Sequence, residues 1–245
     1  FIRNLSFSYD KKNKVIDNLN FAIKKGEKVA IVGENGAGKS TLIKLLLRLY
    51  EPDEGEIFYN DHPIESFELE AFRRVFGVVF QDYSIYGLSV SENIKMGAVE
   101  KSDRLCVFDS LTAVGLNDLA DDVASGNNTP LTREFHNDGI VLSGGQRQKI
   151  AISRLLAREY DIAVLDEPSA SLDPISEKKV IDELLKITKQ KTILLISHRL
   201  SIAKKMDTII FLENGRIVEK GSHQELMDLE GKYAAMYKLQ AQSYQ

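Results

Sequence analysis

A glycine-rich loop between two regular segments is the feature that most limits what this chain can fold into. The stretch Gly33-Glu-Asn-Gly-Ala-Gly-Lys39-Ser40 follows the apolar run Lys28-Val-Ala-Ile-Val32. Leucines at helical spacing come directly after it, at positions Leu42, Leu45, Leu46 and Leu49. A strand, a G-x-x-x-x-G-K-[ST] loop and a helix in this order are typical of a phosphate-binding loop. A glycine-rich turn without a ligand is the other interpretation, and the strand–helix context argues against it.

The chemistry of such a loop explains why these residue types are needed. Glycines let successive backbone N–H groups curl around a phosphate without Cβ clashes, and the N-terminus of the following helix adds partial positive charge. Lys39 is placed to reach the β- and γ-phosphates, and Ser40 offers its hydroxyl to Mg²⁺. We therefore expect the phosphates to be bound by Gly33, Glu34, Asn35, Gly36, Ala37, Gly38, Lys39, Ser40 and Thr41.

Three short runs are apolar on both faces, which indicates a mostly parallel sheet covered by helices. They are Lys28–Val32, Ile162–Leu165 and Thr192–Ser197. Further strands are predicted at 55–60 and 75–80, and Asn214-Gly215 predicts a hairpin between 208–212 and 216–219. Residues 86–158 carry mostly helical or loop patterns, so we expect a helical subdomain there, inserted into one α/β unit that spans 1–245.

Composition and charge exclude several classes of protein. The chain has 245 residues, of which 43% are hydrophobic, which excludes a disordered chain. Its net charge of −4 argues against an electrostatic nucleic-acid binder. No apolar run approaches the roughly 18 residues of a membrane span. The single cysteine, Cys106, fits a reducing compartment. Because the chain begins at Phe1 rather than Met, we expect it to be a piece of a longer protein.

Two carboxylates end the second apolar run, in Ile162-Ala-Val-Leu-Asp166-Glu167. Asp166, at a strand end beside the phosphate loop, is placed to hold Mg²⁺ directly or through water. Glu167 is placed to polarise an attacking water as general base. A strand with acidic residues at its end is otherwise simply solvated, and the phosphate loop upstream favours the catalytic interpretation.

A second candidate anion site begins at Leu142-Ser-Gly-Gly-Gln146. Ser143 is predicted to cap a helix whose buried face carries Ile152, Leu155 and Leu156. An isolated Ser-Gly-Gly would be an ordinary capped helix. Here the pentapeptide, together with the phosphate loop, resembles the signature motif of the ATP-binding cassette (ABC) ATPases. This resemblance covers essentially the whole chain, with the motifs in family order.

The resemblance implies roles for four further residues. Tyr9 matches the aromatic residue that stacks on adenine, although a tyrosine packed in the core is the other interpretation. Gln81 matches the glutamine that senses the γ-phosphate and Mg²⁺ and contacts a transmembrane partner. Asp173, in Ser171-Leu172-Asp173, matches a loop that communicates across a dimer, or else simply starts a helix. His198 matches the switch histidine that contacts the γ-phosphate.

The family pattern also implies cofactors and partners. ATP and Mg²⁺ are expected, with Ser40, Gln81 and Asp166 at the metal and Glu167, His198 and Gln81 in catalysis. Two cassettes, identical or homologous, would sandwich two ATP molecules, each held by one chain's phosphate loop and the other chain's signature. The residues acting on the partner's ATP would be Ser143, Gly144, Gly145, Gln146 and Asp173. The implied fold is a mostly parallel P-loop NTPase core with an antiparallel β part.

Flanking segments resemble exporter cassettes within this family. Residues 87–94 are similar to the segment after the exporter glutamine loop, and residues 215–226 to the exporter C-terminal hairpin and helix. We therefore expect an ATPase motor domain at the cytoplasmic face of a membrane, with its transmembrane helices outside this chain. The alternatives are a separate importer subunit, a nucleic-acid-associated cassette ATPase, and a sensing module without turnover. The acidic balance disfavours the nucleic-acid partner, and the presence of Glu167 and His198 disfavours the sensor.

Overall fold

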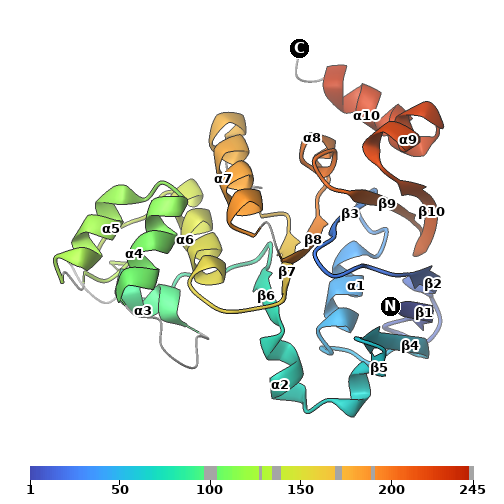
Figure 1. Cartoon of the computed structure of the whole chain (residues 1–245), viewed down its shortest axis with the longest axis horizontal. Coiled ribbons are helices and arrows are strands. Elements are labelled where there is room, and N and C mark those ends of the chain that lie inside the picture. The colour runs from blue at the N-terminus through green and yellow to red at the C-terminus, as the bar shows by residue number, and fades with distance from the viewer. Residues whose placement is uncertain (97–103, 127–128, 134–138, 169–172, 189–190, 243–245) are drawn as a thin grey trace. The chain divides into compact units, whose positions relative to one another are not determined.

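The computed structural model describes residues 1–96, 104–126, 129–133, 139–168, 173–188 and 191–242. Its strands are β1 (Ile2–Phe7), β2 (Ile16–Phe21), β3 (Lys28–Val32), β4 (Glu54–Tyr59), β5 (His62–Pro63), β6 (Phe76–Val79), β7 (Ile162–Asp166), β8 (Thr192–Ile196), β9 (Thr208–Glu213) and β10 (Arg216–Gly221). Its helices are α1 (Lys39–Leu46), the 3₁₀ turn η1 (Ile64–Ser66), α2 (Leu69–Arg74), α3 (Val90–Lys95), α4 (Arg104–Ala113), α5 (Asn117–Ala124), α6 (Gly144–Leu156), α7 (Pro174–Ile187), α8 (Leu200–Ala203), α9 (His223–Asp228) and α10 (Lys232–Gln242) (Figure 1).

The chain divides into two compact units. The first contains Phe1–Phe76, Asp161–Asp166 and Gln190–Gln245, and the second contains Gly77–Tyr160 and Glu167–Lys189. That residues 86–158 form a separate helical subdomain stays a prediction. The unit that contains this range is larger, because it also includes most of β6 and all of α7.

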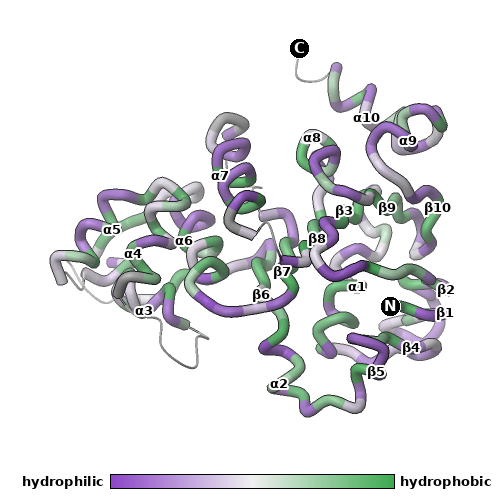
Figure 2. The backbone as a smooth tube through the Cα atoms, in the orientation of Figure 1, coloured by the Kyte–Doolittle hydropathy of each residue, from purple (hydrophilic) through white to green (hydrophobic). Residues whose placement is uncertain are grey.

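A mostly parallel sheet forms the centre of the first unit. The order is β10-β9-β3-β8-β7-β6, where the first five strands lie wholly in this unit and β6 passes from it into the second. β3 pairs in parallel with both β8 and β9, and β7 pairs in parallel with β8. Strands β3, β7, β8 and β9 are predominantly hydrophobic along their length (Figure 2), because strands covered on both faces have no polar side. The predicted α/β class is confirmed.

Two antiparallel features complete the β structure. A four-stranded sheet has the order β2-β1-β4-β5. The predicted hairpin is present as β9 and β10, paired antiparallel. Its turn residues Asn214 and Gly215 both have positive φ, 48° and 74°, as a type I′ turn requires.

The helix after the glycine loop is shorter than its leucine spacing predicts. α1 ends at Leu46, because Arg48 takes the left-handed conformation with φ 51°. The N–H of Leu49 then bonds to Lys44 O at 2.8 Å and that of Arg48 to Leu45 O at 3.0 Å, which is a Schellman ending. The prediction that Leu49 shares one helix face with Leu42, Leu45 and Leu46 is therefore wrong, since Leu49 lies beyond the end of α1 and its side chain is 48% exposed.

The second unit is built mainly from α3 to α7. Ser89 and Ser143 begin α3 and α6 with complete capping boxes, so two helix starts are encoded locally. Ile152 and Leu155 are buried on α6 as predicted, and Leu156 is half-buried. Among the helices that the structure describes, none is long and apolar enough to cross a membrane.

Gly77 in β6 is where packing in the second unit leaves least room. A Cβ added there would overlap Leu155 Cδ1 and lie 2.8 Å from Tyr160 Cδ1. We expect Gly77→Ala to lower the free energy of unfolding by about 1–3 kcal/mol through overpacking. Urea denaturation measures this cost.

The matched comparison is the same substitution in a Leu155→Ala background, where the overlapping Cδ1 atom is gone. There the additional cost of Gly77→Ala should shrink. An unchanged cost in the two backgrounds would contradict the steric explanation.

Candidate active site

The predicted phosphate loop joins β3 to α1 in the first unit. A Cβ on Gly33 would overlap the backbone oxygen of Leu212, so this position requires glycine. Gly38 has φ 101°, and a Cβ there would lie 2.8 Å from Val15 O. Gly38 is also the N-cap of α1 and has no side chain to bond the first N–H groups. Those donors therefore face the loop and suit an anion.

Lys39 is the first residue of α1 and lies against the loop. Its side chain is buried, and its ammonium donates to Gly33 O at 2.9 Å and to Glu34 O at 2.8 Å. A buried cation beside the positive end of a helix attracts a multiply charged anion strongly. The geometry thus suits the predicted contact with phosphate.

Asp166 lies at the carboxyl edge of the parallel sheet, the edge at which such sheets bind ligands. It is buried at the end of β7. In the ladder, Ile196 of β8 is level with Ile31 on one side and Asp166 on the other. Asp166 is therefore two strand spacings, roughly 10 Å, from the end of β3 that leads into Gly33.

The residues predicted to hold Mg²⁺ fit such an ion. Ser40 supplies an exposed hydroxyl and Asp166 a carboxylate, both hard oxygen donors of the kind that Mg²⁺ prefers. The described residues contain no group of three or more His, Cys, Asp or Glu side chains able to hold a metal. An ion here would take its remaining ligands from water and from phosphate oxygens, as is usual for Mg²⁺.

Tyr9 is half-exposed and lies beside α1. Its hydroxyl is 3.2 Å from Thr41 Oγ1, and its ring makes an edge contact with Phe7 at a centroid distance of 5.0 Å. A second edge contact with Tyr50 has a centroid distance of 5.3 Å. With 49% of its surface exposed, Tyr9 keeps an accessible ring surface near the phosphate loop. The adenine role stays a prediction.

His198 follows β8 and is exposed. β8 lies beside β3 in the sheet, so His198 leaves the sheet at the same carboxyl edge as Gly33 and Asp166. Its main-chain oxygen accepts a hydrogen bond from Gln240 Nε2 at 2.6 Å. The structure thus places the predicted switch histidine at the edge of the sheet that carries the glycine-rich loop.

The second unit brings Gln81 and the signature segment into one hollow. This hollow has a volume of about 400 Å³ and is lined by Gln81, Asp82, Tyr83, Ser84, Gly144, Arg147 and Gln148. Gln81 is exposed, two residues after the end of β6. The hydroxyl of Tyr83 donates to Gly144 O at 3.4 Å. The segment after β6 and the start of α6 therefore lie side by side.

Ser143 caps α6 in a way that leaves its hydroxyl proton available. Its Oγ accepts the N–H of Gln146 at 3.2 Å, and Gln146 Oε1 in return accepts the N–H of Ser143 at 2.9 Å. Because the hydroxyl acts only as acceptor in this cap, it can still donate to an anion. Ser143 and Gly144 are exposed, and their predicted contact with another chain's ligand stays a prediction.

Glu167 directly follows β7 and Asp173 directly precedes α7, and both belong to the second unit. Glu167 is half-buried and has left-handed φ of 48°, a costly conformation for a non-glycine residue. Its main-chain oxygen accepts from Gln148 Nε2 at 3.5 Å. Asp173 starts α7, where its carboxylate accepts the N–H of Ser176 at 3.0 Å. Ser171 and Leu172 lie outside the described residues, and the dimer role of Asp173 stays a prediction.

Sequence reasoning missed a network that fixes the segment after Gln81. Arg154 of α6 donates to Ser84 O and Asn93 O, both at 2.8 Å, and to Asn93 Oδ1 at 3.0 Å. Asn93 is fully buried and donates to the main-chain oxygens of Tyr86, Leu88 and Ser89. Burial lowers the pKa of Arg154. The sequence does contain one sign of this network. Arg154 stands next to positions predicted to be buried, Ile152 and Leu155, where a charged side chain needs hydrogen-bond partners.

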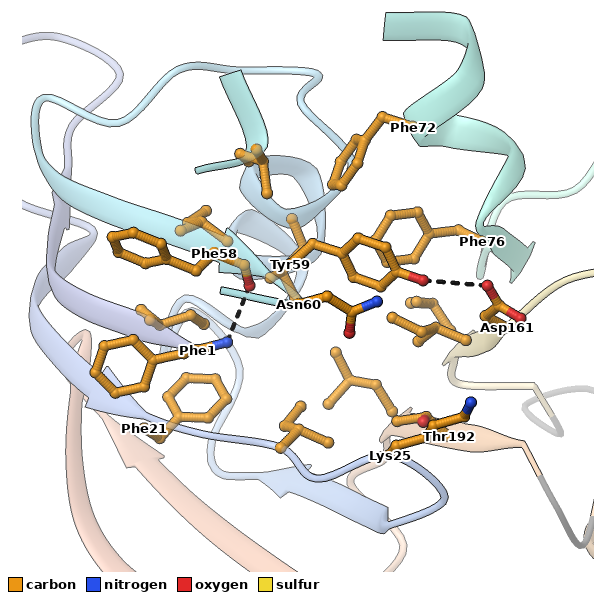
Figure 3. Close-up of a pocket in the computed structure, with 18 of the residues that line it drawn as sticks. Phe1, Phe21, Lys25, Phe58, Tyr59, Asn60, Phe72, Phe76, Asp161 and Thr192 are labelled. Carbon is orange, nitrogen blue, oxygen red and sulfur yellow. Dashed lines mark hydrogen bonds between the residues drawn. The ribbon is translucent and has the colours of Figure 1, made fainter. Parts of the chain in front are cut away.

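A separate pocket lies away from the predicted site residues, none of which lines it. Its volume is about 410 Å³, and aromatic side chains form much of its wall, among them Phe21, Phe58, Phe72 and Phe76 (Figure 3). The hydroxyl of Tyr59 donates to Asp161 at 3.1 Å at its edge. The pocket lies where β7 and β8 begin, at the opposite edge of the sheet from the phosphate loop.

Comparison with known proteins bears on the family of this chain. The family model described as "ABC transporter" matches residues 16–170. ATP-dependent lipid A-core flippases are 37% identical over 235 residues in Alcanivorax borkumensis and 39% over 237 residues in Coxiella burnetii. Each alignment covers 96% of this chain and 40% of the relative, so the chain spans less than half of these proteins.

A solved structure matches as well. It is a bacterial Atm1-family ABC exporter with ATP bound, with a TM-score of 0.89 and 32% identity over 98% of this chain and 41% of that chain. The chain therefore belongs to the ABC transporter family, and the relatives named above to which it is similar are flippases and an exporter.

Proposed function

We propose that this domain binds Mg–ATP at the loop between β3 and α1 and hydrolyses it in a site that a second cassette completes. The observation that carries this proposal is the presence of two separate helix N-termini built for anions. α1 offers uncapped N–H groups and buried Lys39, and α6 offers exposed Ser143 and Gly144. One triphosphate needs one phosphate loop, so a second exposed cradle suits the ATP of another chain.

Each predicted residue has a defined task in this proposal. The ring of Tyr9 stacks on adenine, Lys39 contacts the β- and γ-phosphates, and Ser40 and Asp166 hold Mg²⁺ with Gln81. When bound, Mg²⁺ neutralises charge that develops on the phosphate oxygens. His198 contacts the γ-phosphate from the same edge of the sheet.

The proposed chemistry is attack of water on the γ-phosphorus. The water proton passes to the carboxylate of Glu167 as the new bond forms. The bond from the γ-phosphorus to the bridging oxygen breaks, releasing ADP and inorganic phosphate. The strained backbone of Glu167 supports this role, since such conformations persist where the surroundings hold a side chain in a required direction.

Export across a membrane is the proposed use of this ATPase cycle. The named relatives are flippases and the solved neighbour is an exporter, and this chain spans about two fifths of each. We therefore assign transmembrane helices, and selection of the transported compound, to the remaining part of such a protein. Closure of two cassettes on ATP at the cytoplasmic face, and their opening after hydrolysis, would move those helices. A homodimer or a homologous cassette would supply the second signature.

The role of Tyr9 is tested by removing its ring. Aromatic stacking on a base contributes about 1–3 kcal/mol, so Tyr9→Ala should weaken ATP binding about 5- to 150-fold. Tyr9→Phe keeps the ring and loses only the contact with Thr41, and it should bind ATP nearly as wild type does. Isothermal titration calorimetry measures both. Equal affinities of Tyr9→Ala and wild type would rule out the stacking role.

The role of Glu167 is tested by separating binding from chemistry. Glu167→Gln keeps the shape of the side chain and removes the base, so turnover should fall about 10²- to 10⁴-fold while ATP binding persists. Unhydrolysed ATP should then hold two chains together, which light scattering detects as a doubled mass. Glu159→Gln, which alters an exposed carboxylate, serves as the control. Wild-type turnover of Glu167→Gln with no increase in mass would contradict the assignment.

Sharing of each site between two chains is tested by mixing two inactive variants. Lys39→Ala has a damaged loop and an intact signature, and Ser143→Arg has the reverse, so each alone should be inactive. A mixed dimer carries both lesions in one site and leaves the other intact. Equimolar mixtures should therefore regain part of the wild-type ATPase rate. Mixtures that stay as inactive as the separate variants at high protein concentration would exclude the sandwich.

A further inference from the structure

The C-terminal helix α10 reaches the loop that carries His198. The side-chain amide of Gln240 bonds to the main chain on both sides of Arg199. Its Nε2 donates to His198 O at 2.6 Å, and its Oε1 accepts the N–H of Leu200 at 2.9 Å. One side-chain amide thus bonds to this loop in the way that a backbone peptide group of a neighbouring strand would. The two helices concerned, α8 and α10, lie near each other in Figure 1.

The bond from Gln240 to Leu200 gives the start of α8 a hydrogen-bond acceptor that the N-cap side chain does not provide. Leu200 is the first residue of α8, and the first N–H groups of a helix have no partner within it. The N-cap residue, Arg199, makes no side-chain capping bond. Gln240 therefore acts as a cap delivered from another helix.

The sheet and Ser197 also hold the main chain of this loop. The N–H of Ser197 bonds to Ile31 O at 3.4 Å, two residues before Gly33. The N–H of Arg199 bonds to Ser197 Oγ at 2.9 Å. The backbone around His198 is thus held from β3 on one side and from α10 on the other.

α10 is itself firmly attached within the first unit. Tyr233 is fully buried, and its hydroxyl is 2.8 Å from His223 Nδ1. Glu219 of β10 accepts the N–H of Tyr233 at 3.0 Å. Near Gln240, Lys204 Nζ donates to the hydroxyl of Tyr237 at 3.2 Å. A helix anchored at its start can hold Gln240 in a defined place.

We propose that Gln240 is a positioning residue for ATP hydrolysis, which holds His198 in place through the main chain of its loop. This rests on the proposed role of His198 at the γ-phosphate. Gln240 needs no contact with ATP, so its loss should affect the chemical step rather than nucleotide affinity. The C-terminal helix is then part of the catalytic apparatus and not only a packing element.

The experiment compares Gln240→Ala and Gln240→Met with Gln242→Ala in the purified 245-residue chain. Methionine keeps the length of the side chain without the amide, and Gln242 is an exposed glutamine on the same helix. Misplacement of a catalytic group by about 1 Å can cost up to roughly 100-fold in rate. We expect both Gln240 variants to lower kcat about 10-fold with KM within about 2-fold of wild type, and Gln242→Ala to match wild type.

A readout that does not depend on activity is hydrogen exchange at Leu200. Its N–H should exchange faster in both Gln240 variants than in Gln242→Ala, while the melting temperature stays close to that of the control. Unchanged exchange together with unchanged kcat would overturn the proposal. A lower kcat/KM that is accompanied by a large fall in melting temperature would also overturn the proposal, because Gln240 would then have only a structural role.

A double-mutant cycle separates this inference from the proposed function. If Gln240 acts through His198, Gln240→Ala should lower the residual rate of His198→Ala by less than about 2-fold. If Gln240→Ala lowers the rate of His198→Ala by as much as it lowers the wild-type rate, the positioning role is overturned. If His198→Ala alone leaves kcat unchanged, the proposed role of His198 fails first. If His198→Ala is slow and Gln240→Ala is not, only the positioning inference fails.

Discussion

The register of three parallel strands is the constraint on which the functional edge of the first unit depends. In the ladder, Ile196 of β8 is level with Ile31 of β3 and Asp166 of β7. The chain reaches Gly33 two residues after Ile31 and His198 two residues after Ile196. Since all three strands run the same way, the loop, the carboxylate and the histidine leave the sheet at one edge. A slip of one residue in either pairing would turn these groups to the other face.

The two helix N-termini show how one physical principle serves two purposes. α1 begins after Gly38, which leaves its first N–H groups uncapped and facing the loop. α6 begins after Ser143, whose hydroxyl caps the helix as acceptor and can still donate. The first arrangement gives up a local cap, typically worth about 1 kcal/mol, at a place where a phosphate can replace it. The second is stable without a ligand and remains able to contact one.

Much of the first unit and its candidate site follows from short-range patterns in the sequence. The apolar runs at β3, β7 and β8 indicate buried strands, and Asn214-Gly215 indicates the hairpin. The end of α1 does not follow from such patterns, because it depends on Arg48 taking a left-handed conformation that favours glycine. The leucine spacing continues past that point, and a periodic pattern carries no information about where a backbone turns. Arg154 was missed for a related reason, since its partners Ser84 and Asn93 are main-chain and amide oxygens far away in sequence.

Among the helix starts that the structure describes, the capping box and the contact from Gln240 to α8 differ in what can disturb them. Ser89, Ser143 and Ser222 each cap their helix through a glutamate or glutamine three residues later, so those starts are encoded within a few residues. α8 has no such cap and is only one turn long, too short to be stable by itself. Its start, and with it the place of His198, depends on Gln240 some 40 residues further along the chain. The order of that loop is thus a property of the folded unit and not of a local sequence pattern.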